Sequence, residues 1–201
     1  MDLASGEYKV VFDAWTKGGR MTDATLLTDR ARPAVRLERL LPDPPATVWR
    51  ALTDRERLRS WFPSDVIVEG GRWVAGAAIT FPFPPEIIDM TLIGRVLEVD
   101  EPNVLVFTWG DDALRFELTP HEGGTRLVLI DELPASGAAR NAAGWDTCLD
   151  RLAGLEPSAE AWPPRFAVYV ALFEPALGTQ EGPPAGYKGD PPARKERHGN
   201  G

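Results

Sequence analysis

The sequence predicts an α+β fold in which a curved antiparallel sheet of about six to seven strands wraps around one long helix near the C-terminal end. The first observation is the order of the expected elements: one strand, two short helices, further strands and then the long helix. The second is that glycine, proline and aspartate interrupt the apolar segments at short intervals, which is typical of turns between antiparallel neighbours. The third is that a sheet must cover its apolar face, and only this helix is long enough to do so.

Residues 1–32 are expected to form an N-terminal extension that is partly disordered, with a short strand over residues 8–12. Met21 follows a Lys-Gly-Gly-Arg stretch, which is what a ribosome-binding site would encode if it were translated. We therefore hypothesise that Met21 is the natural start of the chain.

The expected domain covers residues 33–155 and begins with a strand over residues 34–41, which a proline ends. Pro44 and Pro45 are tolerated in the first turn of a helix, so we expect a helix here and then a second short helix capped by Asp54. Alternating apolar residues predict the remaining strands at residues 66–69, 72–74 with 77–81, 90–99, 104–109, 113–119 and 125–132.

The longest helix is expected over about residues 137–155, with Ser136 as its cap and apolar residues at helical spacing. Residues 156–177 have apolar residues at helical spacing after two prolines, and we expect a short helical appendage there. The segment 178–201 is rich in glycine and proline and has few apolar side chains, so we expect it to be disordered.

Composition and charge exclude several classes of protein. The formal net charge of −8 opposes binding to a phosphate backbone, so we expect no nucleic-acid partner. No apolar run approaches the ~20 residues that span a bilayer, and no secretory signal begins the chain. We therefore expect a cytoplasmic protein that does not insert into a membrane.

The chain also has few residues for metal binding or nucleophilic catalysis. One cysteine, Cys148, excludes an internal disulfide and a thiolate zinc cluster, and we expect it to be a buried small residue of the long helix. The two histidines are His121, expected in a hairpin turn, and His198 in the tail. All lysines lie outside residues 33–177, which excludes a Schiff-base lysine there. We expect no metal and no cofactor.

Several segments together carry a recognisable pattern: PPATVWRALTD at residues 44–54, LRSWF at 58–62, GRVLEVDEP at 94–102, LVFTW at 105–109, GGTRL at 123–127 and the helix over 144–152. Their order and spacing resemble the START/polyketide-cyclase (SRPBCC) superfamily, in the branch related to the activator of Hsp90 ATPase. The resemblance covers about residues 34–155.

This resemblance implies the helix-grip fold, an antiparallel sheet of about seven strands around a long C-terminal helix with a cavity between them. Members of the superfamily bind lipids, polyketides and other apolar molecules; some catalyse cyclisation or hydrolysis, and others act on Hsp90 as co-chaperones. Relatives often carry a histidine at the position of Asp131, so chemistry that depends on that imidazole is not expected here.

Large apolar side chains on the expected concave face and on the long helix are the candidates for lining a ligand cavity. Aromatic residues dominate protein cores in any case, so ordinary core packing is the alternative interpretation for each of them. The candidates are Trp61, Phe81, Val96, Phe107, Trp109, Phe116, Leu129, Trp145 and Leu149.

Asp131 and Glu132, at the end of the last expected strand, are weak candidates for catalysis. Successive strand residues point to opposite faces, so only one of the two can face the cavity. A carboxylate buried there would have a raised pKa and act as a general acid or base, whereas the alternative is a solvated charge at the rim. Asp146 is expected on the exposed face of the long helix.

We therefore expect binding of a small apolar or amphipathic ligand, lipid or polyketide-like, between sheet and helix. The alternative is a cyclase or hydrolase that uses a cavity carboxylate without metal or covalent nucleophile. A further alternative is a co-chaperone-like module that contacts an Hsp90-type partner through its outer surface.

Overall fold

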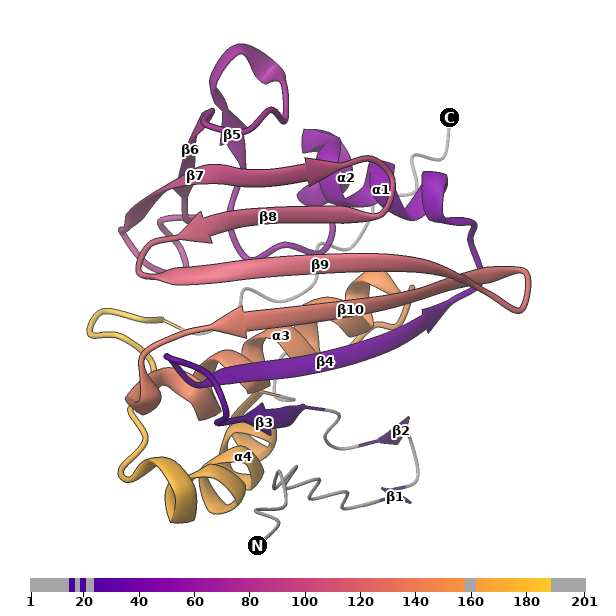
Figure 1. The fold of residues 1–201 in the computed structure, drawn as a ribbon. Helices are drawn as coiled ribbons and strands as arrows, with labels where there is room; N and C mark the ends of the chain where they lie inside the picture. Colours follow the sequence, from indigo (N-terminus) through magenta and orange to yellow (C-terminus); the bar gives the residue numbers. More distant parts are fainter. Residues whose placement is uncertain (1–14, 17–18, 21–23, 158–161, 189–201) are drawn as a thin grey trace, which may run out of the picture.

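The computed structural model describes residues 15–16, 19–20, 24–157 and 162–188 (Figure 1). The strand expected at residues 8–12, the candidate start Met21 and the end of the tail at 189–201 lie outside the described residues.

An eight-stranded antiparallel sheet forms the centre of the fold (Figure 1). Its order is β3-β4-β10-β9-β8-β7-β6-β5, so the strand after the N-terminal extension pairs with the last strand, and the rest follow as hairpin neighbours. The strands are β3 (Thr25–Leu27), β4 (Ala34–Leu41), β5 (Ile67–Val68), β6 (Ala78–Pro82), β7 (Thr91–Asp100), β8 (Val104–Trp109), β9 (Asp112–His121) and β10 (Gly124–Glu132). A separate two-stranded pair joins β1 (Trp15–Thr16) to β2 (Gly19–Arg20).

The helices gather on one side of this sheet. Helix α3 (Ala138–Leu152) crosses behind β4 and β10 in Figure 1, and α4 (Trp162–Leu177) packs against α3. Helices α1 (Pro45–Thr53) and α2 (Arg55–Leu58) follow β4, and Asp54 caps α2 as expected by accepting from the N–H groups of Glu56 and Arg57. Two short 3₁₀ turns, Glu69–Gly71 and Ala135–Gly137, complete the list. A curved sheet holding a long helix is the predicted α+β architecture.

Two details of the sheet differ from the sequence prediction. Residues 72–74 form no strand, because the chain turns through a 3₁₀ helix and a positive-φ glycine on either side of them. The additional strand is β3, which comes from the segment expected as an extension and pairs with β4. A three-residue strand carries too little alternation to be recognised without its partner.

The segment after α4 differs from the expectation of a flexible tail as far as residue 188. Gln180 is 8% exposed, its Oε1 accepts from the Ala139 N–H at 3.0 Å, and its Nε2 donates to the Ala135 carbonyl at 3.1 Å. This side chain, not Ser136, therefore satisfies an N–H group in the first turn of α3. Further along, the Lys188 N–H donates to the Ile87 carbonyl at 2.8 Å.

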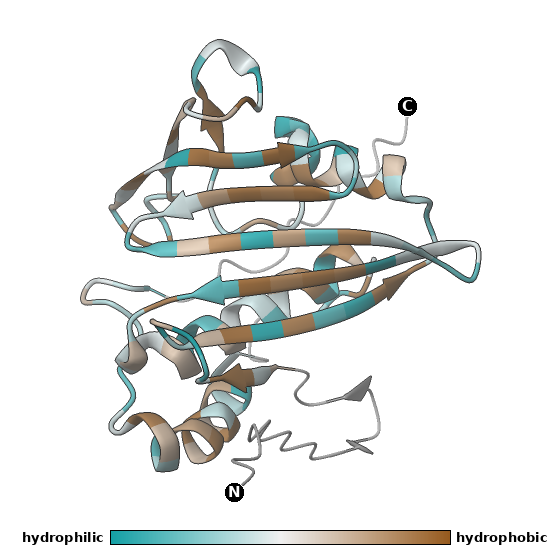
Figure 2. Ribbon diagram, viewed as in Figure 1, coloured by the Kyte–Doolittle hydropathy of each residue, from teal (hydrophilic) through white to brown (hydrophobic). Residues whose placement is uncertain are grey.

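The core lies between the concave face of the sheet and the helices. On β9, Leu114, Phe116 and Leu118 are buried there, while Arg115 and Glu117 point outward. Figure 2 shows this alternation as hydrophobic and hydrophilic residues that follow one another along the central strands. The alternation therefore confirms which side chains face the helices.

Candidate functional site

All nine predicted cavity residues lie in the interior between sheet and helices. Eight are buried, and Trp109 at the end of β8 is half-buried. The structure therefore brings together residues from a loop after α2, from five strands and from α3: Trp61, Phe81, Val96, Phe107, Trp109, Phe116, Leu129, Trp145 and Leu149.

The aromatic rings in this interior touch one another in a continuous cluster. Phe107 stacks on Phe116 with ring centroids 5.9 Å apart, and Trp109 meets Trp145 at 5.2 Å. Phe62, which was not among the cavity candidates, joins the cluster through Trp145 at 5.4 Å. These contacts agree with the core-packing interpretation for most of the rings. Trp109, at the end of β8, is one of the half-buried members of this cluster.

Asp131 lies at this same end of the interior and is fully buried. Its Oδ2 accepts hydrogen bonds from Asn141 Nδ2 at 2.9 Å and from Trp145 Nε1 at 2.8 Å, both on α3. Its Oδ1 is also buried and has no hydrogen-bond partner among the described residues. Burial, together with the nearby Asp112 carboxylate, raises the pKa of Asp131 from 3.8 to about 7.

Asn141 connects Asp131 to a second carboxylate. Its Nδ2 also donates to Asp112 Oδ2 at 2.8 Å, so one amide group holds two acidic side chains. Burial raises the pKa of Asp112 as well, partly offset by the Asn141 hydrogen bond and by the charges of Arg140 and Arg32. Two neighbouring carboxyl groups that both resist ionisation form an arrangement suited to holding a proton.

Trp109, near Asp131 and Asp112, has a second buried polar atom without a hydrogen-bond partner among the described residues. It is paired in register with Asp112 across β8 and β9, and its ring contacts the ring of Trp145. The Trp109 Nε1–H is buried but donates to no acceptor within the described part of the chain. Sequence reasoning identified Trp109 and Asp131 separately; that both contact Trp145 follows only from the fold.

Gly144 of α3 is partly exposed and has free space beside it. No heavy atom outside its own chain neighbours and its own helix backbone would lie within 4 Å of a Cβ at this position. Asp146, one residue after Trp145, faces Arg39 of β4. Because successive helix residues are about 100° apart, Gly144, one residue before Trp145, is on the opposite flank, away from β4.

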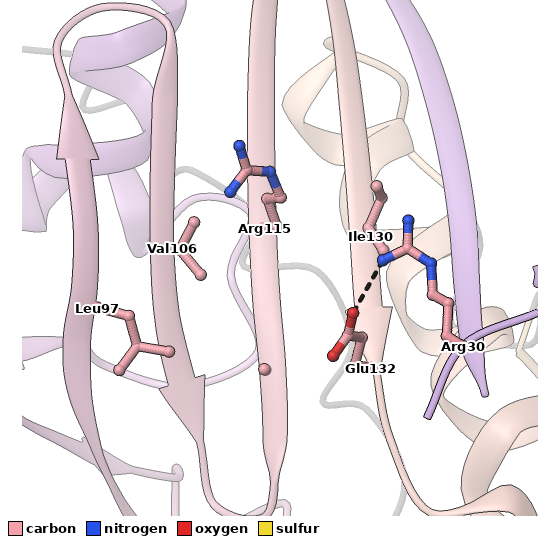
Figure 3. A pocket seen from close by; sticks show the side chains of 7 residues that line it. Arg30, Leu97, Val106, Arg115, Ile130 and Glu132 are labelled. Carbon is pink, nitrogen blue, oxygen red and sulfur yellow. Dashed lines mark hydrogen bonds and ion pairs between the residues drawn. The ribbon is translucent and has the colours of Figure 1, made fainter. Parts of the chain in front are cut away.

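Glu132 lies on the other face of the sheet, as strand alternation requires. Its carboxylate pairs with Arg30 at 2.8 Å, and both side chains are about two-fifths exposed (39% and 40%). Figure 3 shows the pair in front of the strands, beside a pocket of about 200 Å³ on this outer face. The pocket is lined by Arg30, Leu97, Val106, Ala113, Arg115, Ile130 and Glu132. Of the two catalytic candidates, only Asp131 therefore faces the interior.

The prediction that Asp146 is exposed was wrong. Its side chain is buried, and it forms an ion pair with Arg39 and accepts a hydrogen bond from the Tyr169 hydroxyl at 2.9 Å. Helix α4 covers this face of α3. The sequence predicted a helical appendage at residues 156–177 but not where it packs, so this burial could not be predicted. Cys148 is buried, as expected, and His121 ends β9 at the hairpin turn.

Neither a metal centre nor a membrane span is evident in the described residues. No group of three or more histidine, cysteine, aspartate or glutamate side chains is placed there to hold a metal ion. None of the described helices combines the length and the apolar character that crossing a bilayer requires.

Solved structures share this fold. A conserved protein of unknown function from Enterococcus faecalis aligns with a TM-score of 0.61 and 24% identity over 74% of this chain and 89% of its own. CalU16 from Micromonospora echinospora aligns with a TM-score of 0.60 and 19% identity over 76% and 95%. DynU16, from the dynemicin biosynthetic locus, aligns with a TM-score of 0.52 and 26% identity over 60% of this chain and 46% of its own.

Sequence comparison agrees with the fold. No curated protein matches the chain significantly. The family described as Activator of Hsp90 ATPase homolog 1-like protein matches residues 43–155, more than half of the chain. The helix-grip architecture and this match together confirm the resemblance, and the chain belongs to the Activator of Hsp90 ATPase homolog 1-like family.

Proposed function

We propose that this protein binds a small apolar or amphipathic molecule between α3 and the β8 side of the sheet. The observation that carries the proposal is the aromatic cluster of Trp145 and Trp109 between α3 and β8, with free space at the partly exposed Gly144 that precedes Trp145 in the chain. Ligand sites are typically concave, mostly apolar and equipped with a few polar groups that orient the ligand. The buried Asp131 and the Trp109 N–H are such groups.

Binding is tested by filling the space with a side chain. We expect Gly144→Leu to weaken binding of 2-naphthol, 2-methoxynaphthalene or dodecanoate about tenfold or more in isothermal titration calorimetry, because the new side chain competes for the volume. Gly144→Ala is the matched control: it adds one methyl group where nothing lies within 4 Å and should leave affinity nearly unchanged.

Both variants should remain folded, since alanine and leucine favour a helix interior more than glycine by ~0.5–1 kcal/mol. Thermal unfolding followed by circular dichroism verifies this. If the wild-type protein binds none of the three probes, or if Gly144→Leu binds them as tightly as Gly144→Ala, the proposal is wrong.

Acid–base catalysis on a bound polyketide-like molecule is the second candidate. It is favoured by Asp131, because a pKa near 7 lets this carboxyl group both accept and release a proton at neutral pH. DynU16 comes from a biosynthetic locus, which agrees with such a role. Native mass spectrometry of the purified protein identifies a bound molecule; conversion of that molecule by the wild type but not by Asp131→Asn would support catalysis, and equal conversion would exclude this role for Asp131.

A further inference from the structure

Exposed apolar side chains gather on the outer face of the sheet, opposite the helices (Figure 1). Ile67 of β5 and Ile93 of β7 are 40% and 74% exposed, and each is paired in register with the outward-facing Thr80 between them. Leu97, four residues further along β7, is 48% exposed on the same face (Figure 3). Among the large apolar side chains of the described residues, Ile93 has the largest exposed fraction.

A hollow lies beside these side chains. It is the pocket of about 200 Å³ on the outer face, in which Ala113 has the smallest side chain of the lining residues. Val106 and Ile130, on the strands to either side of β9, enclose the room that this short side chain leaves. A cavity of about 150 Å³ holds a benzene molecule, so the hollow has room for one branched aliphatic side chain.

The exposed side chains and the hollow form one surface, which we call the outer patch. Its residues are Ile67, Ile93, Leu97, Val106, Ala113 and Ile130. Contiguous exposed apolar surface of this kind is typical of an interaction site. Because only β8 separates β7 from β9, Ile93 and Ala113 lie about two strand spacings, ~10 Å, apart across the sheet.

A protruding side chain and a hollow on the same face are what a two-fold interface requires. Such an interface brings the same surface of two copies together, so that each contact between a residue of one copy and a residue of the other occurs twice. Ile93 and the hollow at Ala113 can therefore satisfy each other reciprocally between two copies.

The charges around the outer patch also favour a second copy. The patch is bordered by three arginines and three glutamates: Arg30, Arg95, Arg115, Glu98, Glu117 and Glu132. This face is thus balanced, although the formal net charge of the chain is −8. A basic peptide or an anionic membrane needs an excess of one sign, whereas two identical faces that carry both signs can bring arginine opposite glutamate.

We propose that this protein forms a two-fold dimer through the outer patch, in which Ile93 of each copy packs into the hollow at Ala113 of the other. This dimer is independent of ligand binding between α3 and the sheet, because it uses the opposite face. The patch extends ~24 Å from β5 to β10 and ~14 Å along β7 from Ile93 to Leu97. Since specific interfaces bury ~800 Å² on each partner and this patch is smaller, we expect a weak dimer with a Kd of about 10–100 µM.

Analytical ultracentrifugation of the full chain measures this equilibrium. We expect the wild type to change from monomer to dimer between about 5 and 500 µM. Ile93→Glu would bring a charge into the apolar hollow and should raise the Kd about tenfold or more. Leu40→Glu is the matched control, because Leu40 is 60% exposed on the outer face of β4 but lies outside the patch. It should dimerise as the wild type does, and circular dichroism verifies that both variants are folded.

Disulfide trapping tests the arrangement of the two copies. A mixture of Ile93→Cys and Ala113→Cys proteins should form a covalent dimer under mild oxidation faster than either protein alone, because position 93 meets position 113 and not itself. The native Cys148 is buried and does not compete.

Several results would overturn the inference. They are a wild type that stays monomeric at about 500 µM, a dimer that Ile93→Glu leaves intact or that Leu40→Glu weakens equally, and trapping no faster in the mixture than in the single proteins. A monomeric wild type that binds another protein or lipid vesicles through this face would likewise overturn it, because the patch would then have a different occupant.

Discussion

Asp131→Asn should change how the stability of this protein depends on pH. The side chain is fully buried, and its pKa rises from 3.8 to about 7 on folding, mainly through desolvation. At 1.36 kcal/mol for each pKa unit, this corresponds to about 4 kcal/mol, as an upper value, by which folding disfavours the ionised carboxylate. Between about pH 4 and pH 7 the unfolded chain has lost this proton and the folded chain still holds it, so stability falls as pH rises through this interval.

The asparagine variant removes that titration and should lack that fall. Urea unfolding at pH 4 to 8 measures the free energy of unfolding of both proteins; the difference between them should shift in favour of the variant by up to ~4 kcal/mol over this range. Glu132→Gln, one residue along the strand but on the outer face, should keep the wild-type decline. Parallel profiles of the wild type and Asp131→Asn would refute the assignment of the buried proton to Asp131.

Two further predictions concern what holds α3 in place. Asp146→Ala removes one of the carboxylates that neutralise Arg39, and it should lower the free energy of unfolding by about 3 kcal/mol in urea titration; Glu56→Ala, in an exposed ion pair, should cost less than ~1 kcal/mol. A loss no larger for Asp146→Ala than for Glu56→Ala would contradict the buried role. Gln180→Ala deletes the acceptor of the Ala139 N–H and should cost about 1 kcal/mol in thermal unfolding, and an unchanged melting temperature would refute this capping role.

Local patterns predicted the elements that have strong periodicity. The strand around Phe116 is recognisable because its apolar residues alternate with charged ones. The same alternation shows which side chains of the strand face the interior. Helix α3 is recognisable from apolar residues at helical spacing. The cap by Gln180 was not predictable, because the contact joins residues 41 positions apart and glutamine has no intrinsic preference that marks it.

The candidate site was predicted in part. Strand parity showed that Asp131 and Glu132 must lie on opposite faces, and the structure puts Asp131 inside. Its hydrogen-bond partners Asn141 and Trp145 were not linked to it by sequence, since their contact depends on how α3 lies on the sheet. The burial of Asp146 was also missed. It depends on how α4 packs on α3, which the sequence does not show.

The sequence by itself determined most of the strands and helices and their order along the chain, the faces of the central strands and the family to which the chain belongs. These properties depend on side-chain spacing, turn residues and short motifs, all of which are local along the chain. Tertiary structure alone decided that Asp112, Asn141 and Asp131 form one network and that two polar atoms beside Trp145 stay unmatched among the described residues. The pKa and hydrogen bonding of a carboxyl group depend on desolvation and on neighbours distant in sequence, and only the packed fold supplies both.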